Sequence, residues 1–346
     1  MELIETPEFQ RLRHVSQLGV NSLVFPGATH TRFSHSLGTF WVAKRILQRL
    51  DEIGALGETF DGDNAEKERW TDAVKAAALL HDLGHGPFSH VWERATGVEH
   101  ESLTRSLLTG DSNIGKVLVR YELLDLVKDL ILGKVEPDKR FLVDIISSQV
   151  DADRFDFLLR DAHFTGVRYG GFDIEWLLRA LCLGRVKIEG KPTTKLCVDR
   201  PKGLRAVEQF LLARFFMYYQ VYFHRVVRAW EANLLCLLQG IKEEVLCEKK
   251  IGDKKVVKAL LGESKEVLFE EWRIWRSIAS WAESNSVPEG LQCMARRLLR
   301  REHPFRAADF TGHDEDFGKV KERFKRFSYR VHFDDATAEV YKDLLY

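Results

Sequence analysis

The residues with the clearest capacity for chemistry lie between His81 and His90, in the stretch HDLGHGPFSH. It holds three histidines and an aspartate directly after the apolar run AAALL at residues 76–80. An apolar helix that ends in His81 and Asp82 can hold two metal ligands rigidly, and the glycines and proline then turn the chain. A histidine at a helix C-terminus can also simply complement the helix dipole. A His-Asp pair with two further histidines favours a metal site over that alternative.

A metal site at His81 and Asp82 needs further ligands from elsewhere in the chain. His35 is expected in the first turn of a helix, where a cationic imidazole is disfavoured but a neutral, metal-bound one is not. Asp153 and Asp156 are expected on one helix, where a nearby cation would relieve their repulsion, although a solvated acidic face is the alternative. Two imidazoles and two carboxylates suit a divalent transition metal with open positions, as in a catalytic site.

Length and composition describe an ordinary globular protein. The chain has 346 residues, of which 45% are hydrophobic and 30% charged, enough for one large domain or two. Basic and acidic residues number 52 each, so no nucleic-acid partner is expected from net charge. No apolar run approaches the ~20 residues that cross a bilayer, and no signal peptide is visible. Five scattered cysteines read as reduced thiols, so a cytoplasmic protein without a membrane partner is expected.

Helix-period hydrophobic patterns dominate, so the expected fold class is mainly α. Helices are expected over residues 5–19, 35–50, 70–83, 89–96, 100–108, 111–132, 141–161 and 204–245. A β-hairpin is expected over residues 185–198. Residues 54–69, which are rich in glycine and acidic side chains, are expected to form a surface loop.

The expected domain organisation is a core over residues 1–230, whose long helix runs on to about 245, and a helical lobe over 246–346. Three tryptophans, Trp272, Trp275 and Trp281, indicate a packed subdomain in that lobe. Its last part is expected to contain a loop at 312–318, a strand at 329–333 and a helix at 336–345.

On the helix expected over 204–245, Arg214, Tyr218 and Tyr222 follow at i, i+4 and i+8 and share one face. Such a stripe could stack on and clamp a phosphorylated aromatic ligand. Ordinary amphipathic packing with exposed polar tips is the commoner origin of this pattern. The polar side chains of the first expected helix read as a solvated face in the same way; they are Gln10, Arg11, Arg13 and Gln17.

Taken together, these residues resemble the HD-domain phosphohydrolases, and among them the deoxynucleoside triphosphate triphosphohydrolase branch. The matching motifs are FQRLR at 9–13, QLG at 17–19, VFPG at 24–27, RFSHSLG at 32–38, LHDLGHGPFSH at 80–90, HE at 100–101, DAD at 151–153 and RD at 160–161. They cover about residues 5–230, and no SAM domain is visible. The resemblance implies an HD-domain helical core with a small β-hairpin and a helix-rich C-terminal lobe.

The resemblance also implies roles for the residues at matching positions. The implied metal ligands are His35, His81, Asp82 and Asp153. The implied catalytic residues are His90 and His100, with Glu93 as their supporting carboxylate. The implied substrate contacts are Gln17, Leu18, Arg32, His85, Arg154, Asp161, Arg214, Tyr218 and Tyr222. The implied contacts of an activating nucleotide, GTP or a dNTP, are Gln10, Arg13, His224 and Arg225.

Three positions depart from the family pattern. Phe157 stands in place of a tyrosine, Tyr218 in place of a histidine, and Gln220 in place of an arginine of the effector pocket. The first two bear on base and sugar selectivity, and the third bears on nucleotide activation.

The implied reaction is metal-dependent hydrolysis of a dNTP to a deoxynucleoside and tripolyphosphate, with water attacking the α-phosphorus. His90 is suited to protonate the leaving 5′-oxygen near neutral pH. The implied cofactors are one divalent transition metal (Fe, Mn, Zn or Ni) and Mg²⁺ bound with the nucleotide, and the implied assembly is a homodimer or tetramer. Two alternatives stay open: another HD-superfamily phosphohydrolase (nucleotidase, phosphodiesterase or single-strand nuclease), or a nucleotide-binding scaffold with weak activity.

Overall fold

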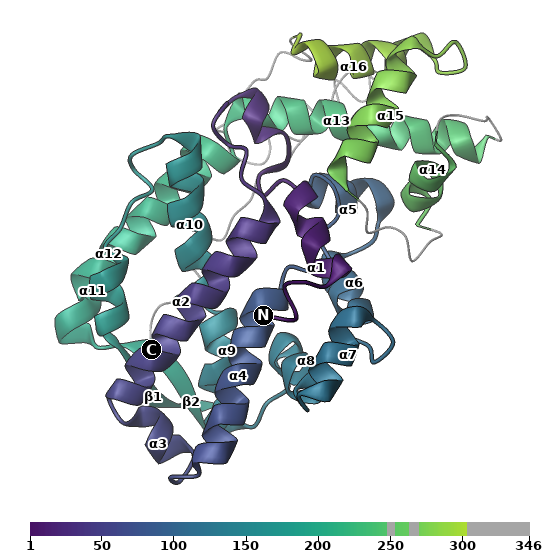
Figure 1. Ribbon diagram of the computed structural model, residues 1–346. Coiled ribbons are helices and arrows are strands. Elements are labelled where there is room, and N and C mark those ends of the chain that lie inside the picture. Colours follow the sequence, from purple (N-terminus) through teal and green to yellow (C-terminus); the bar gives the residue numbers. More distant parts are fainter. Residues whose placement is uncertain (248–252, 263–269, 303–346) are drawn as a thin grey trace.

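The computed structural model describes residues 1–247, 253–262 and 270–302 (Figure 1). Over these residues the chain is mainly helical, as the sequence predicts, and its only sheet there is a two-stranded hairpin. The loop, strand and helix expected at 312–318, 329–333 and 336–345 lie outside the described residues. No helix among the described residues is long and apolar enough to cross a membrane.

The elements that surround the candidate site come from most of the chain. The helices are α1 (Pro7–Gln10), α2 (Arg32–Glu52), α3 (Ala55–Thr59), α4 (Asn64–Leu80), α5 (His90–Thr96), α6 (His100–Leu107), α7 (Asn113–Arg120), α8 (Leu124–Leu132), α9 (Arg140–Ile146), α10 (Ala152–Thr165), α11 (Ile174–Arg179), α12 (Arg200–Met217), α13 (Arg225–Leu246), α14 (Lys254–Leu260), α15 (Glu271–Glu283) and α16 (Glu289–Arg300). The strands are β1 (Leu181–Ile188) and β2 (Lys191–Val198), paired antiparallel with Leu181 opposite Val198. The predicted hairpin is therefore confirmed.

The long α2 forms the centre of the larger hydrophobic core. It packs against α10 on one side and α4 on the other (Figure 1). Fully buried apolar side chains fill the space between these helices and their neighbours; they include Leu50, Ala77, Phe141, Phe155 and Phe210. Burial on this scale, at about 25 cal/mol per Å² of apolar surface, is the main stabilising term of such a fold.

A second hydrophobic cluster joins the C-terminal helices to the site-bearing part of the chain. Trp230 of α13 and Trp281 of α15 are buried in it together with Val20, Phe88 and Trp92. This cluster contains residues from both the expected core over 1–230 and the expected lobe over 246–346. The division between the two therefore stays a prediction.

The helix expected over residues 5–19 is wrong beyond its first turns. The four-residue α1 is followed by a 3₁₀ turn at Arg11–His14, and the chain is extended by Val15. Ser16 then pairs with Thr31 in a short antiparallel bridge. Two short successive turns bury apolar residues at the same spacing as a continuous helix would, so the spacing alone does not distinguish the two.

The surface loop expected over residues 54–69 is also wrong, because α3 and the first part of α4 lie there. The carboxylate of Asp63 caps α4 by accepting hydrogen bonds from the backbone N–H groups of Ala65 and Glu66. An acidic cap and an acidic first turn both suit the positive end of the helix dipole. The acidic residues therefore start a helix instead of marking a loop.

Two helices expected as continuous are each interrupted. The segment 141–161 divides into α9 and α10, since Ser147 is extended and Asp151 caps α10 through the backbone N–H of Arg154. The segment 204–245 divides at a π-helical turn, Tyr218–Tyr222, after which the Nδ1 atom of His224 caps α13. Both breaks lie beside the candidate site. The second is a π-helical turn, a feature that is frequent at functional sites.

Candidate active site

The residues expected to hold a metal come together from three parts of the chain. Nε2 of His35 lies 3.1 Å from Oδ1 of Asp153 and 3.7 Å from Oδ2 of Asp82. Nε2 of His81 lies 3.5 Å from Oδ1 of Asp153 and 3.4 Å from Oδ1 of Asp82. Single ligand atoms of His35, His81 and Asp153 all lie within 4.8 Å of one another, so one ion can bridge them, and Asp82 borders this group.

The second ring nitrogen of each histidine fixes its orientation. Nδ1 of His35 lies 2.9 Å from Oδ2 of Asp156, and Nδ1 of His81 lies 2.9 Å from the carbonyl oxygen of Ala78. Each Nδ1 can therefore donate a proton while Nε2 presents a lone pair, the usual arrangement of metal-binding histidines. Both Nε2 atoms are buried without a hydrogen-bond partner among the described residues, which is costly unless a metal takes the lone pair. The donor set fits a divalent metal ion.

The carboxylates around His35 create a strong preference for positive charge. Burial by itself lowers the pKa of His35, but the adjacent carboxylates of Asp153 and Asp156 raise it to about 10. A divalent cation at the same place would supply positive charge and leave the imidazoles neutral. Mixed imidazole and carboxylate donors suit Mn, Fe, Ni or Zn.

Arg32 joins this group of expected metal ligands to the turn that precedes α5. Its Nη1 atom forms an ion pair with Asp82. Its Nε and Nη2 atoms donate hydrogen bonds of 2.9 and 2.8 Å to Oγ of Ser89. The guanidinium is thus held in one orientation beside the expected metal ligands, with the geometry that suits a phosphate oxygen.

Three histidines and a glutamate form a second group next to the expected metal ligands. The rings of His85 and His100 stack at 3.9 Å, and the ring of His90 lies edge-on to both at 5.4 and 6.0 Å. Oε1 of Glu93 lies 2.5 Å from Nδ1 of His100, and Oε2 lies 3.0 Å from Nδ1 of His90. One carboxylate therefore orients two imidazoles.

The histidines of this group differ in charge preference. Burial by itself lowers the pKa of His100, but its hydrogen bond to Glu93 raises it overall. Burial would raise the pKa of Glu93, but hydrogen bonds from His100 and His90 lower it. Burial, followed by the charge of Arg32, lowers the pKa of His85 to about 3. His85 is therefore neutral near pH 7, whereas Glu93 shifts His100 towards its protonated form.

Two glycines allow the close approaches on which these contacts depend. A Cβ atom at Gly84 would lie 2.1 Å from the carbonyl oxygen of His100, so only glycine lets the start of α6 reach the turn after α4. A Cβ atom at Gly38 would lie 1.8 Å from Oδ1 of Asp156, so glycine also lets α10 pack onto α2 beside His35.

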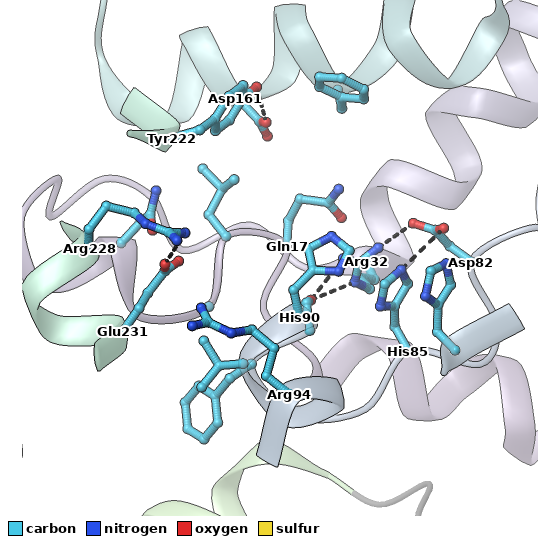
Figure 2. A pocket seen from close by; sticks show the side chains of 18 of the residues that line it. Gln17, Arg32, Asp82, His85, His90, Arg94, Asp161, Tyr222, Arg228 and Glu231 are labelled. Carbon is cyan, nitrogen blue, oxygen red and sulfur yellow. Dashed lines mark hydrogen bonds and ion pairs between the residues drawn. The ribbon is translucent and has the colours of Figure 1, made fainter. Parts of the chain in front are cut away.

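Both groups open into a pocket of about 430 Å³. Figure 2 shows Arg32, Asp82 and His85 at one end and the paired Arg228 and Glu231 at the opposite end. Among the residues expected at the site, the lining contains Gln17, Leu18, Arg32, Asp82, His85, His90, His100, Asp153, Asp161, Tyr218 and Tyr222. The pocket therefore places apolar, aromatic and hydroxyl-bearing walls next to a charged end.

Two residues expected to contact substrate have their side chains engaged elsewhere. Arg154 forms an ion pair with Asp151, and Arg214 is buried with its Nη1 atom 3.2 Å from Oε1 of Gln149. Neither lines the pocket. Tyr222 does line it, and its hydroxyl donates a 2.7 Å hydrogen bond to Oδ2 of Asp161.

The residues expected to bind an activating nucleotide also lie outside the pocket lining. Gln10 donates to the carbonyl of Ile4, and the guanidinium of Arg13 lies 3.7 Å from the centre of the Phe33 ring. His224 caps α13, and Arg225 is exposed. Their effector role stays a prediction.

Several residues near the site were not singled out from the sequence. His30 is buried, with Nε2 2.7 Å from Oδ1 of Asp161. Arg11, expected on a solvated face, is buried instead and donates hydrogen bonds of 2.9 and 2.6 Å to the carbonyls of His85 and Leu83. His30 lies just before the RFSHSLG motif, which is a usable signal, but nothing local marks Arg11 as buried.

Comparison with known proteins identifies the class. A family model described as the HD domain matches residues 32–156, which include all four expected metal ligands. A second model, described as an HD associated region, matches residues 188–260. The chain belongs to the HD-domain superfamily.

Individual relatives place the chain more closely. It is 40% identical to the Bacillus subtilis protein YwfO over 248 residues, 70% of this chain and 52% of the relative. It is 32% identical to the human deoxynucleoside triphosphate triphosphohydrolase SAMHD1 over 212 residues, 52% of this chain and 33% of the relative. A solved phosphohydrolase structure from Bacteroides thetaiotaomicron matches with a TM-score of 0.75 at 28% identity, covering 94% of this chain and 79% of the other. The chain spans about half the length of YwfO and of other curated relatives that it matches.

Proposed function

We propose that the protein is a metal-dependent phosphohydrolase that cleaves deoxynucleoside triphosphates to a deoxynucleoside and tripolyphosphate. The observation that carries this proposal is the group of His35, His81, Asp82 and Asp153, whose two buried Nε2 atoms have no partner among the described residues. This group opens into a pocket that is also lined by Arg32 and three histidines. Similarity to human SAMHD1 supports the choice of substrate.

Each group has a defined task in this reaction. When bound, a divalent metal ion would polarise an α-phosphate oxygen and lower the pKa of an attacking water. Arg32 and the neutral His85 bind phosphate oxygens, because both lie at the charged end of the pocket. Glu93 holds His90 and His100, and His90 gives its proton to the leaving 5′-oxygen.

The opposite part of the pocket accounts for the nucleoside. Asp161 and Tyr222 lie on one wall, where their carboxylate and hydroxyl can meet the sugar. Leu18, Phe157 and Phe223 give the pocket apolar surface for the base and sugar. Phe157 supplies ring area but no hydroxyl, so the sugar contacts fall to Asp161 and the two tyrosines.

A homodimer or tetramer is part of the proposal. α12 and the π-helical turn after it present apolar side chains to solvent: Leu212, Phe215 and Phe216 of α12 and Tyr219 of the turn are all more than a third exposed. Exposed apolar surface of this kind commonly mediates association. Light scattering of the purified protein, with and without a dNTP, measures the assembly directly.

A panel of the four dNTPs tests the activity, with Mn²⁺ and Mg²⁺ present and with or without GTP. We expect tripolyphosphate and the matching deoxynucleoside as products, and we expect Asp82→Ala to abolish turnover. Release of orthophosphate or pyrophosphate in place of tripolyphosphate would exclude cleavage of the bond between the α-phosphorus and the 5′-oxygen. Turnover of a nucleoside monophosphate or a single-stranded oligonucleotide, but of no dNTP, would instead favour a nucleotidase or nuclease.

A further inference from the structure

Glu271 is a buried carboxylate at the start of α15, in the C-terminal part of the chain. Its Oε1 atom accepts hydrogen bonds from the Ser16 hydroxyl at 2.8 Å and from the Trp275 indole N–H at 3.3 Å. Its Oε2 atom accepts from the backbone N–H groups of Ser16 at 3.1 Å and Phe88 at 3.3 Å. The donors Ser16 and Phe88 lie 255 and 183 residues away along the chain. One side chain thus fastens three distant segments together.

Burying the Glu271 carboxylate costs free energy, because the group loses its hydration. Four hydrogen bonds and the N-terminal end of α15 compensate Glu271 for that loss. Removing one partner of such a network leaves a buried polar group unsatisfied, which costs more than an average hydrogen bond.

The turn that Glu271 holds is strained. Phe88 and Ser89 have φ values of 55° and 50°, in the left-handed region that residues with a side chain rarely adopt. Strain of this kind persists only where surrounding contacts determine the conformation. α15 supplies two such contacts, because Glu271 accepts from the Phe88 amide and the Trp275 ring packs edge-on against the Phe88 ring at 5.4 Å.

The strained turn leads directly into the candidate active site. Oγ of Ser89 accepts both hydrogen bonds from Arg32 and lies 3.4 Å from the carbonyl oxygen of Ser16. The remaining terminal nitrogen of Arg32 pairs with Asp82. His90 follows Ser89 as the first residue of α5. The conformation of this turn therefore sets both the phosphate-facing arginine and the proposed proton donor.

We propose that Glu271 is a positioning residue of the active site, acting through the Phe88–Ser89 turn on Arg32 and His90. The C-terminal lobe thereby becomes part of the catalytic apparatus, although no residue of α15 lines the pocket. This inference rests on the proposed function, in which Arg32 and His90 act on the phosphate.

Glu271→Gln in the full chain tests the proposal. The amide keeps the size of the carboxylate, but its NH₂ group must face one of the N–H donors, so at least one hydrogen bond is lost. We expect kcat to fall about tenfold to a hundredfold, while KM changes less than about threefold and the bound metal content stays constant. The matched control is Glu270→Gln, which removes the adjacent carboxylate that pairs with Arg273 and should leave kcat within about twofold.

A double-mutant cycle with Ser89→Ala separates positioning from general destabilisation. If Glu271 acts through Ser89, the double variant should be scarcely slower than Ser89→Ala alone, because neighbouring residues of one network are not additive. Additive losses in kcat would overturn the proposal. Should Glu271→Gln not fold, Ser16→Ala removes one hydrogen bond to the same carboxylate, and an unchanged kcat in that variant would also overturn it.

Amide hydrogen exchange gives a readout that does not depend on the substrate. Peptides covering residues 86–92 should exchange faster in Glu271→Gln than in wild type or Glu270→Gln. Unchanged exchange there would refute the positioning role even if the wild-type protein hydrolysed no dNTP. The absence of dNTP hydrolysis by the wild-type protein, by itself, would refute the proposed function and not the positioning role.

Discussion

At the scale of residues, Glu93 orients two of the proposed catalytic histidines. It bonds to Nδ1 of both His90 and His100 and shifts His100 towards its protonated form. Glu93→Gln removes the negative charge but keeps the shape. We expect the pKa of His100 to fall towards its ordinary value, because the hydrogen bond and charge that raise it are lost. If the reaction needs protonated His100, its rate then begins to fall at a lower pH in the variant than in the wild type.

The measurement is kcat/KM against pH for both proteins. The descending limb on the alkaline side should move to lower pH in Glu93→Gln, and kcat at the optimum should fall about tenfold to a hundredfold. A limb at the same pH in both proteins would show that Glu93 does not control the titrating group. Glu101→Gln, an exposed neighbour on α6, serves as control.

His30 gives a second prediction at this scale. Its Nε2 atom and the Tyr222 hydroxyl each bond to one oxygen of Asp161. His30→Leu removes one donor and lets the Asp161 carboxylate move, whereas Gln at this position can keep an N–H donor. The proposed function places Asp161 against the sugar, and we assign its carboxylate to the 3′-hydroxyl. We therefore expect His30→Leu to lose about tenfold in kcat/KM for the dNTP.

The comparison that isolates this effect uses the 2′,3′-dideoxy analogue of the same nucleotide. That analogue lacks the hydroxyl, so its kcat/KM should change little between wild type and His30→Leu. Equal losses for both nucleotides would mean that His30 supports the fold and not hydroxyl recognition.

How far single residues could be predicted from the sequence depended on local signals. His81 and Asp82 were predictable because two adjacent ligand-type side chains follow an apolar helix, with two more histidines within the next ten residues. Arg11 was not, because its burial depends on carbonyl groups more than 70 residues away. The sequence shows an arginine on a short helix, and only the folded turn after α4 supplies its acceptors.

At the scale of elements, glycine placement decides whether α6 can reach the turn after α4. Gly84→Ala would put a methyl group 2.1 Å from the His100 carbonyl oxygen. The clash is with a backbone atom, which cannot move aside without displacing the start of α6. We expect α6 to shift away, the stacking of His85 on His100 to be lost, and unfolding free energy to fall by about 1–3 kcal/mol. Activity should fall more than tenfold.

Denaturant unfolding and kcat together test this expectation. Gly110→Ala is the matched control, because a methyl group there meets nothing within 4 Å, and it should leave both quantities nearly unchanged. An active Gly84→Ala protein of wild-type stability would show that the two elements tolerate separation.

Element types were more predictable than element ends. The mainly helical fold and the hairpin followed from periodicity, but the breaks at Asp151 and His224 did not. Each break depends on a side chain that caps the next helix, and a carboxylate or imidazole inside a helical pattern gives no unambiguous sign of that role. The early start of α4 was missed for the same reason, since Asp63 caps it.

At the scale of the whole molecule, the candidate site is assembled from distant parts of the chain. Its expected metal ligands come from α2, from the end of α4 and from α10, and Glu271 of α15 braces the adjoining turn. Sequence spacing alone cannot show that α15 reaches the turn beside α5, because no periodic pattern encodes a contact over 183 residues.

Because the expected metal ligands join these distant segments, metal binding should stabilise the entire fold. A ligand that binds only the native state at about 100 times its Kd adds about 2.7 kcal/mol, which for a chain of this size raises Tm by about 5 °C. We expect thermal unfolding of the metal-free protein to shift upward by this amount when Mn²⁺ is added. Asp153→Asn removes one ligand and should abolish the shift, whereas Glu93→Gln should retain it because Glu93 is not expected to bind this ion. An equal rise in the Asp153→Asn protein would mean that Mn²⁺ acts at a different place, and the cluster around His35 would then lose its assignment as the metal centre.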